Sequence, residues 1–119
     1  MRKTAVQLIA EERDRQIKRE GFTAESDDNY APGVLIRAGL CYVIHGANML
    51  MTNRRTKSRP VAWWPFSKSW WKPTPDPVRC LIKGGALIAA EIDRCLREED
   101  RHARKRVKGL VNFDTKKGH

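Results

Sequence analysis

The chain has 119 residues, 40% of them hydrophobic, and its 24 Lys or Arg residues against 14 Asp or Glu give a formal net charge of +10. A chain of this length and composition is expected to fold as one globular domain with a modest core. The charge favours anionic partners, namely nucleic acid, nucleotides or acidic surfaces, although solubility alone would also explain it. Cys41, Cys80 and Cys95 form no C-x-x-C pair, so neither a disulfide framework nor a zinc knuckle is expected.

A first helix is predicted from about Thr4 to Glu20. Thr4 and Gln7 form a capping-box pattern at its start, and Gly21 is a natural stop at its end. The residues that lead into this helix are charged rather than apolar, so no signal peptide is expected. The protein should therefore stay in the cytoplasm where it is made.

Arg13 stands in the middle of the apolar stripe of this helix, where a leucine would be expected, and Gln16 borders the stripe. An inward arginine must pair with an acid or line a polar cavity, because a buried unpaired charge is costly. Both interpretations stay open at this point. Arg13 and Gln16 are therefore candidate ligand-binding residues.

The stretch 21–30 is rich in turn-forming residues and carries three acids. Asp27 and Asp28 could bind a divalent ion, pair with Arg13, or cap a following helix that has Pro32 at its first position. A metal site usually needs more ligands than an Asp-Asp pair supplies. We therefore expect no metal and no cofactor, and we keep Asp28 as a ligand-binding candidate.

A second helix is predicted from Pro32 or Gly33 to about Met51. It is apolar almost all round, which is typical of a central, buried helix. Gly39 and Gly46 lie on one face and would allow another helix to cross closely. Tyr42 lies beside that face, so its hydroxyl needs a partner or a polar pocket, which makes Tyr42 a further candidate.

The apolar character of this second helix has two other interpretations. A homo-oligomer interface would explain apolar residues on both sides. A membrane span is not expected, because polar side chains interrupt the segment at Arg37, His45 and Asn48.

The segment from Thr52 to Asp76 is too long for a simple connector and holds all four tryptophans. From Asn53 to Lys72 it has six Lys or Arg residues and no acid. Aromatic planes interleaved with cations suit a flat, anionic, π-rich partner, such as a nucleotide or single-stranded nucleic acid. A Trp-Pro loop could equally close a small core. The binding candidates in this segment are Trp64, Trp71 and Lys72.

A third helix is predicted from Pro77 through Arg94, extending as far as Lys105, with Asp76 as its N-cap. Its apolar stripe is expected at Val78, Leu81, Ile82, Gly85, Ile88, Ala89, Ile92 and Leu96. Lys83 and Glu91 lie two turns apart on a second edge, where they could frame a polar pocket or face solvent. Both are kept as binding candidates.

The sequence therefore predicts an all-α fold: a small domain of three helices, with a long Trp/Pro-rich loop between the second and the third. Residues 1–98 are expected to form this single domain. Residues 99–119 are strongly basic and are expected to be a partly disordered extension, with nucleic-acid binding as its less favoured function.

Several motifs of the chain resemble a family of small phage and prophage proteins. The chain has AEERDRQI at 10–17 and EGFTAESDD at 20–28, where the family has AERxRQ and EGWTPEHDD. The chain then has WPF at 64–66, WWKP at 70–73 and LIKGGALIAAEIDR at 81–94, which are similar to WPW, WWKP and LVKAGALIxAEIxR. The departures include Phe22 for Trp, Ser26 for His and Gly84 for Ala. The first helix with its following turn also has a short similarity to ryanodine-receptor-type repeat domains.

The resemblance implies a phage accessory protein that acts in the host cytoplasm. Small phage proteins of this size often counter host defence, and one way is to sequester the nucleotide second messengers of bacterial immunity. Because Ser26 replaces the family's histidine, the resemblance gives little support to a His-Asp-Asp metal site.

The favoured function is accordingly that of a binding module for a nucleotide-derived anionic small molecule. The alternatives are a nucleic-acid-binding accessory protein and an inhibitor that binds a host protein. An all-α nucleotide pyrophosphohydrolase is less favoured. Such enzymes resemble an E-E-x-x-E plus E-x-x-D pattern of metal-binding acids. In this chain Arg15 replaces the last acid of the first half, after Glu11-Glu12, and Arg94 replaces the last acid of the second half, after Glu91.

Overall fold

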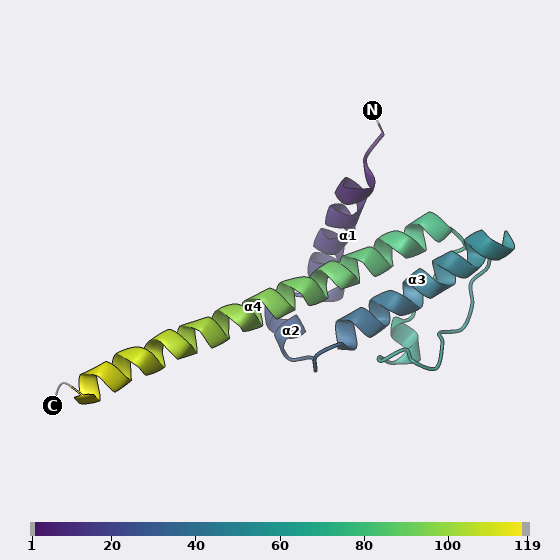
Figure 1. Ribbon diagram of the computed structural model, residues 1–119. Helices are drawn as coiled ribbons and strands as arrows, with labels where there is room; N and C mark the ends of the chain where they lie inside the picture. Colours follow the sequence, from purple (N-terminus) through teal and green to yellow (C-terminus); the bar gives the residue numbers. More distant parts are fainter. Residues whose placement is uncertain (1, 118–119) are drawn as a thin grey trace.

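The computed structural model describes residues 2–117, and the side chains of residues 2–110, as a set of α-helices without strands (Figure 1). The helices are α1 (Ala5–Glu20), α2 (Ala24–Asp28), α3 (Val34–Thr52) and α4 (Pro77–Lys117), with one 3-10 helix, η1 (Lys68–Trp70), in the segment between α3 and α4. The predicted all-α fold class is confirmed. Three of the four α-helices are long, and α2 has a single turn or little more.

The start and the end of α1 follow from local chemistry, as predicted. The amide of Gln7 donates to Thr4 Oγ1 at 3.3 Å, and the amide of Thr4 donates to Gln7 Oε1 at 2.8 Å, so the capping box is complete. Gly21 ends the helix with φ of 77°, in the left-handed region that glycine adopts without strain.

The segment between α1 and α3 differs from its prediction. Thr23 caps a short helix, α2, by accepting from the amide of Ser26 at 3.1 Å, where only turns were expected. The next helix then begins at Val34, after Gly33 with φ of 88°, so Pro32 is not its first residue. The carboxylates of Asp27 and Asp28 are consequently not caps of α3.

Helices α3 and α4 lie side by side in opposite directions and form the centre of the fold (Figure 1). A Cβ atom on Gly39 would lie 2.9 Å from the carbonyl oxygen of Gly84, and one on Gly46 would lie 3.1 Å from that of Pro77. Only glycine allows the backbones to approach so closely. The predicted close helix crossing at Gly39 and Gly46 is therefore confirmed.

The buried face of α4 coincides only in part with the one that the apolar pattern predicts. Val78, Ile92 and Leu96 are about half exposed, whereas the helix turns its small residues and a buried ion pair inward. The inward residues include Cys80, Ile82, Gly84, Ala86, Leu87, Ala90, Glu91 and Arg94. The predicted stripe is therefore confirmed only in part: Ile82 is buried, and Leu81 and Ile88 lie against Gly46 and Gly39 of α3.

Helix α4 continues to Lys117, beyond the predicted end near Lys105, and its second half projects from the rest of the molecule (Figure 1). Every residue from 99 to 110 is exposed. The expected division of the chain near residue 98 stays a prediction.

Among the described residues, α3 is the one helix whose length and apolar composition would suffice to cross a membrane, and 44% of that stretch is buried within the protein. The core helix of a globular domain meets the same criterion. Packing against α4 at Gly39 and Gly46 covers part of this helix.

Candidate functional site

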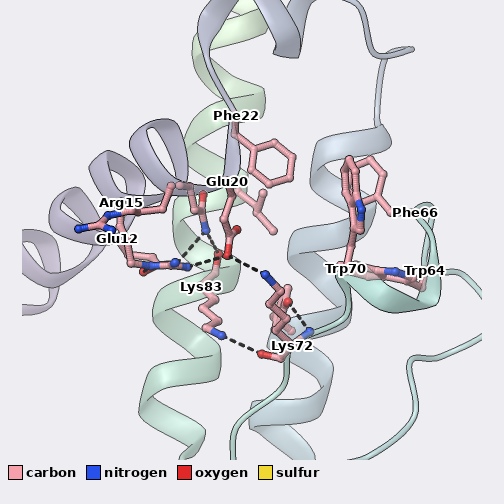
Figure 2. A pocket seen from close by; sticks show the side chains of 13 residues that line it. Glu12, Arg15, Glu20, Phe22, Trp64, Phe66, Trp70, Lys72 and Lys83 are labelled. Carbon is pink, nitrogen blue, oxygen red and sulfur yellow. Dashed lines mark hydrogen bonds and ion pairs between the residues drawn. The ribbon is translucent and has the colours of Figure 1, made fainter.

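A pocket of about 250 Å³ lies where the second half of α1 meets α3, α4 and the segment around η1. Its lining divides into two kinds of side chain. One side is aromatic and the other is charged or polar (Figure 2). The aromatic side consists of Phe22, Tyr42, Trp64, Phe66 and Trp70, and the charged or polar side of Glu12, Arg15, Gln16, Arg19, Glu20, Lys72 and Lys83. Leu87 completes the lining.

The aromatic wall is held together by edge and tilted ring contacts. The ring centroids of Phe66 and Trp70 lie 5.1 Å apart, and those of Phe22 and Phe66 lie 6.0 Å apart. Trp64 meets Phe66 edge-on at 5.6 Å. Trp70 remains 48% exposed, so it is the ring of this wall with most surface still open to a ligand.

Glu12 is the buried anchor of the charged wall. Its carboxylate accepts two hydrogen bonds from Arg15, at 2.7 and 2.8 Å, and also pairs with Arg79. Burial acts to raise the pKa of Glu12, but the two guanidinium groups outweigh burial and hold this pKa below its usual value. Glu12 is thus a fixed anion that positions Arg15.

The remaining charges of this wall leave the pocket cationic. Glu20 accepts from Arg15 at 3.0 Å and lies 4.0 Å from Lys72 Nζ. Arg19 is exposed and forms no ion pair with any residue in the described part of the chain. A guanidinium without an acid partner at the edge of a pocket is suited to an anionic ligand.

Tyr42, Lys72 and Lys83 connect the two walls. The amide of Lys72 donates to the Tyr42 hydroxyl at 3.0 Å, and Lys83 Nζ donates to the carbonyl oxygen of Lys72 at 2.7 Å. Lys83 Nζ also lies 5.6 Å from the centre of the Tyr42 ring. Burial raises the pKa of Tyr42 to about 12, so its hydroxyl is protonated at neutral pH. Burial also lowers the pKa of Lys83.

Gln16 contributes the one buried acceptor of the pocket lining that has no partner among the described residues. Its Nε2 donates to Glu12 at 3.2 Å and to the carbonyl oxygen of Lys83 at 3.4 Å, which fixes the orientation of the amide. Its Oε1 is buried and accepts no hydrogen bond. Such an atom is costly to bury unless a donor is supplied.

The structure brings five of the sequence-predicted binding residues into this pocket: Gln16, Tyr42, Trp64, Lys72 and Lys83. Trp71 does not line it. Its ring stacks on Tyr42 with centroids 4.6 Å apart, and its indole N–H donates to the carbonyl oxygen of Ser58 at 2.7 Å. Trp71 thus packs against the core as one of its aromatic side chains.

The other predicted binding residues form ion pairs outside the pocket. Arg13 donates to Asp27 and to the carbonyl oxygen of Phe22, both at 2.9 Å. Asp28 accepts from Arg97 at 2.9 Å and from Arg101 at 3.1 Å. Glu91 accepts from Arg94 at 2.7 Å, and both are buried. The Arg13 contacts join α1 to α2, the Asp28 contacts join α2 to α4, and the Glu91–Arg94 pair lies within α4.

Eight lining residues were not among the candidates that the sequence indicated: Glu12, Arg15, Arg19, Glu20, Phe22, Phe66, Trp70 and Leu87. One signal was available, because Glu12, Arg15, Gln16 and Arg19 follow the spacing of a single helix face. Their charges are typical of a solvated face, and only the return of the loop from α3 places aromatic rings opposite them.

Within the described residues, no group of three or more His, Cys, Asp or Glu side chains is placed to hold a metal ion. The chain matches no protein-family model, no curated protein and no solved structure.

Proposed function

We propose that this protein binds and sequesters a small anionic molecule that carries an aromatic base, that is, a molecule of the nucleotide class. The observation that carries the proposal is the division of one pocket into an aromatic wall and a cationic wall. A nucleotide has the matching division, with a flat π-surface at one end and a phosphate at the other.

The geometry of the pocket suggests how such a molecule would lie. The base stacks on Trp70, with Phe66 at its edge, because Trp70 has the most exposed ring of the wall. The phosphate then lies toward Arg19, with the ammonium groups of Lys72 and Lys83 beside it. A volume of about 250 Å³ is at the small end of ligand sites, which favours one nucleotide unit, free or as part of a larger cyclic molecule.

The resemblance to phage and prophage proteins gives the proposal its biological setting. A phage protein that sequesters a nucleotide second messenger in the host cytoplasm would protect the phage from the defence that the messenger activates. Sequestration requires tight binding without chemistry, so the ligand should be recovered unchanged from the complex after the protein is denatured.

Replacing Trp70 with alanine is expected to weaken nucleotide binding about fivefold to a hundredfold, because stacking of a base on an aromatic ring contributes about 1–3 kcal/mol. Trp63→Ala is the matched control: Trp63 is similarly exposed, at 44%, but lies outside the pocket. Titration calorimetry with mononucleotides, cyclic dinucleotides and cyclic ADP-ribose isomers measures both variants. If folded protein binds nothing in this panel, or if both variants bind as the wild type does, the proposal is wrong.

The unpaired Oε1 of Gln16 predicts a preference among bases. A base with an amino group can donate to this oxygen, whereas the same purine without its amine cannot. One net hydrogen bond contributes about 0.5–1.5 kcal/mol, so the amine should strengthen binding about twofold to tenfold. Competition between the two nucleotides measures the preference, which Gln16→Leu should abolish. An equal preference in the wild type and in Gln16→Leu would contradict this role.

A further inference from the structure

An apolar stripe runs along α4 into its projecting half, and its side chains are more than half exposed. Ile92, Leu96, Val107 and Leu110 are between 51% and 64% exposed. Their spacing of three, four and eleven residues places them on one side of the helix. The same side of α4 meets α1 further back, where Gly85 packs against Ile9.

A projecting helix usually gains stability when it packs an amphipathic face against another element. Here α1, α2 and α3 all contact α4 before or near Arg101, where the last of these contacts is the ion pair with Asp28. The stripe continues beyond that point to Leu110. This part of α4 projects from the rest of the molecule (Figure 1). The apolar face is therefore longer than the part of the protein that could cover it.

The charges beside the stripe are self-complementary. Residues 98–100 are all acidic, and residues 101–108 contain five Lys or Arg and no acid. If two copies of α4 pack side by side in opposite directions, the acidic segment of each lies against the basic segment of the other. A parallel arrangement would place like charges together.

We propose that a second copy of this chain covers the stripe, so that two α4 helices form an antiparallel pair about a two-fold axis near the peptide between Arg101 and His102. Leu96 and Val107 are equally far from that peptide in opposite directions, so Leu96 of one copy lies level with Val107 of the other. Ile92 lies nearly level with Leu110 in the same way. Each apolar layer occurs twice, as an isologous interface requires.

Charged pairs flank these layers on both edges. Glu99 and Arg106 lie on one edge of the stripe, and Asp100 and Arg104 on the other. Among residues 2–110, neither Glu99 nor Arg106 forms an ion pair within its own chain, and both are exposed. In the antiparallel pair, Glu99 of each copy meets Arg106 of its partner.

Exchange of these two charges tests the arrangement. In the dimer, position 99 of each copy faces position 106 of its partner. Glu99→Arg puts two arginines face to face there, and Arg106→Glu puts two glutamates face to face. Each single change should therefore weaken dimerisation at least tenfold. The double variant, Glu99→Arg with Arg106→Glu, should restore it. An equimolar mixture of the two single variants should form a heterodimer, because their charges are then complementary.

Sedimentation velocity of the full chain over a range of concentrations measures these equilibria, and circular dichroism checks that each variant is folded. Lys105→Glu is the matched control, since Lys105 lies on the opposite side of α4 and its charge reversal should leave the dimer intact. A wild type that remains monomeric at high concentration would overturn the proposal. So would a double variant no better than the single ones, or a monomer whose tail binds single-stranded nucleic acid with a steep salt dependence.

Discussion

Replacing Arg13 with alanine is expected to lower the free energy of unfolding by about 3–5 kcal/mol at pH 7, the usual cost of removing one partner from a buried ion pair. The Asp27 side chain is fully buried and that of Arg13 is 13% exposed, so the truncation leaves a carboxylate in the interior without a countercharge. It also removes the donor to the carbonyl oxygen of Phe22, which begins the segment leading to α2. Urea unfolding measures the change.

The dependence of this cost on pH identifies its cause. Burial raises the pKa of Asp27, and Arg13 opposes that rise. Without Arg13 the pKa of Asp27 rises further, so the carboxyl group becomes protonated at a higher pH than in the wild type, and the uncompensated charge then disappears. The cost of Arg13→Ala should therefore become smaller as the pH is lowered from 7.

Two further variants separate the ion pair from the loss of packing. Arg13→Ala combined with Asp27→Ala removes both charges and should be more stable than Arg13→Ala alone. Arg37→Ala is the matched control, because Arg37 donates to a single carbonyl oxygen, that of Trp63, and faces no buried acid. If Arg13→Ala costs no more than Arg37→Ala at pH 7, the ion pair does not stabilise the fold.

Arg13 also shows what the sequence could and could not predict. Its place in an apolar stripe correctly indicated an inward side chain and named an acid of the Asp27-Asp28 pair as one partner. The pattern could not decide between that partner and a ligand, because the decision depends on where α2 folds against α1. Helix caps were predictable because each depends only on residues a few positions apart in the sequence. Examples are the capping box at Thr4 and the N-cap at Asp76, which accepts from the amide of Val78 at 3.0 Å.

The pocket depends on contacts between distant segments, and for this reason only part of it was predictable. Tyr42 and Lys83 were recognised because each is a polar group beside an apolar face. Arg19 was not, since one exposed arginine on a charged helix face resembles any other. The adjacent indoles of Trp70 and Trp71 differ only in direction, and the 3-10 turn at η1 sets which of them faces the pocket.

The dual role of Tyr42, in the core and in the pocket, predicts how stability changes in alkaline solution. Burial raises the pKa of Tyr42 to about 12 in the folded protein, against the opposing hydrogen bond from the amide of Lys72, whereas the unfolded chain has a tyrosine pKa of about 10. Below pH 10 the phenol is neutral in both states, and its contribution to stability is fully present. Between pH 10 and 12 the unfolded state ionises first, so the free energy of unfolding falls.

With pKa values of about 10 in the unfolded and 12 in the folded state, roughly 2 kcal/mol of stability is lost by pH 12. Tyr42→Phe removes this titration. The substitution should lower the free energy of unfolding by about 1 kcal/mol at pH 8, because the amide of Lys72 loses its acceptor. As the pH rises further, the variant should then lose less stability than the wild type.

Titrations of Lys83 and other groups common to both proteins largely cancel in the difference between the two unfolding curves. Tyr30→Phe, which removes the other phenol of the chain, is the matched control. If the curves of wild type and Tyr42→Phe stay parallel from pH 8 to 12, the Tyr42 hydroxyl is accessible to solvent in the folded protein, and it cannot be the fixed acceptor that links the two walls of the pocket.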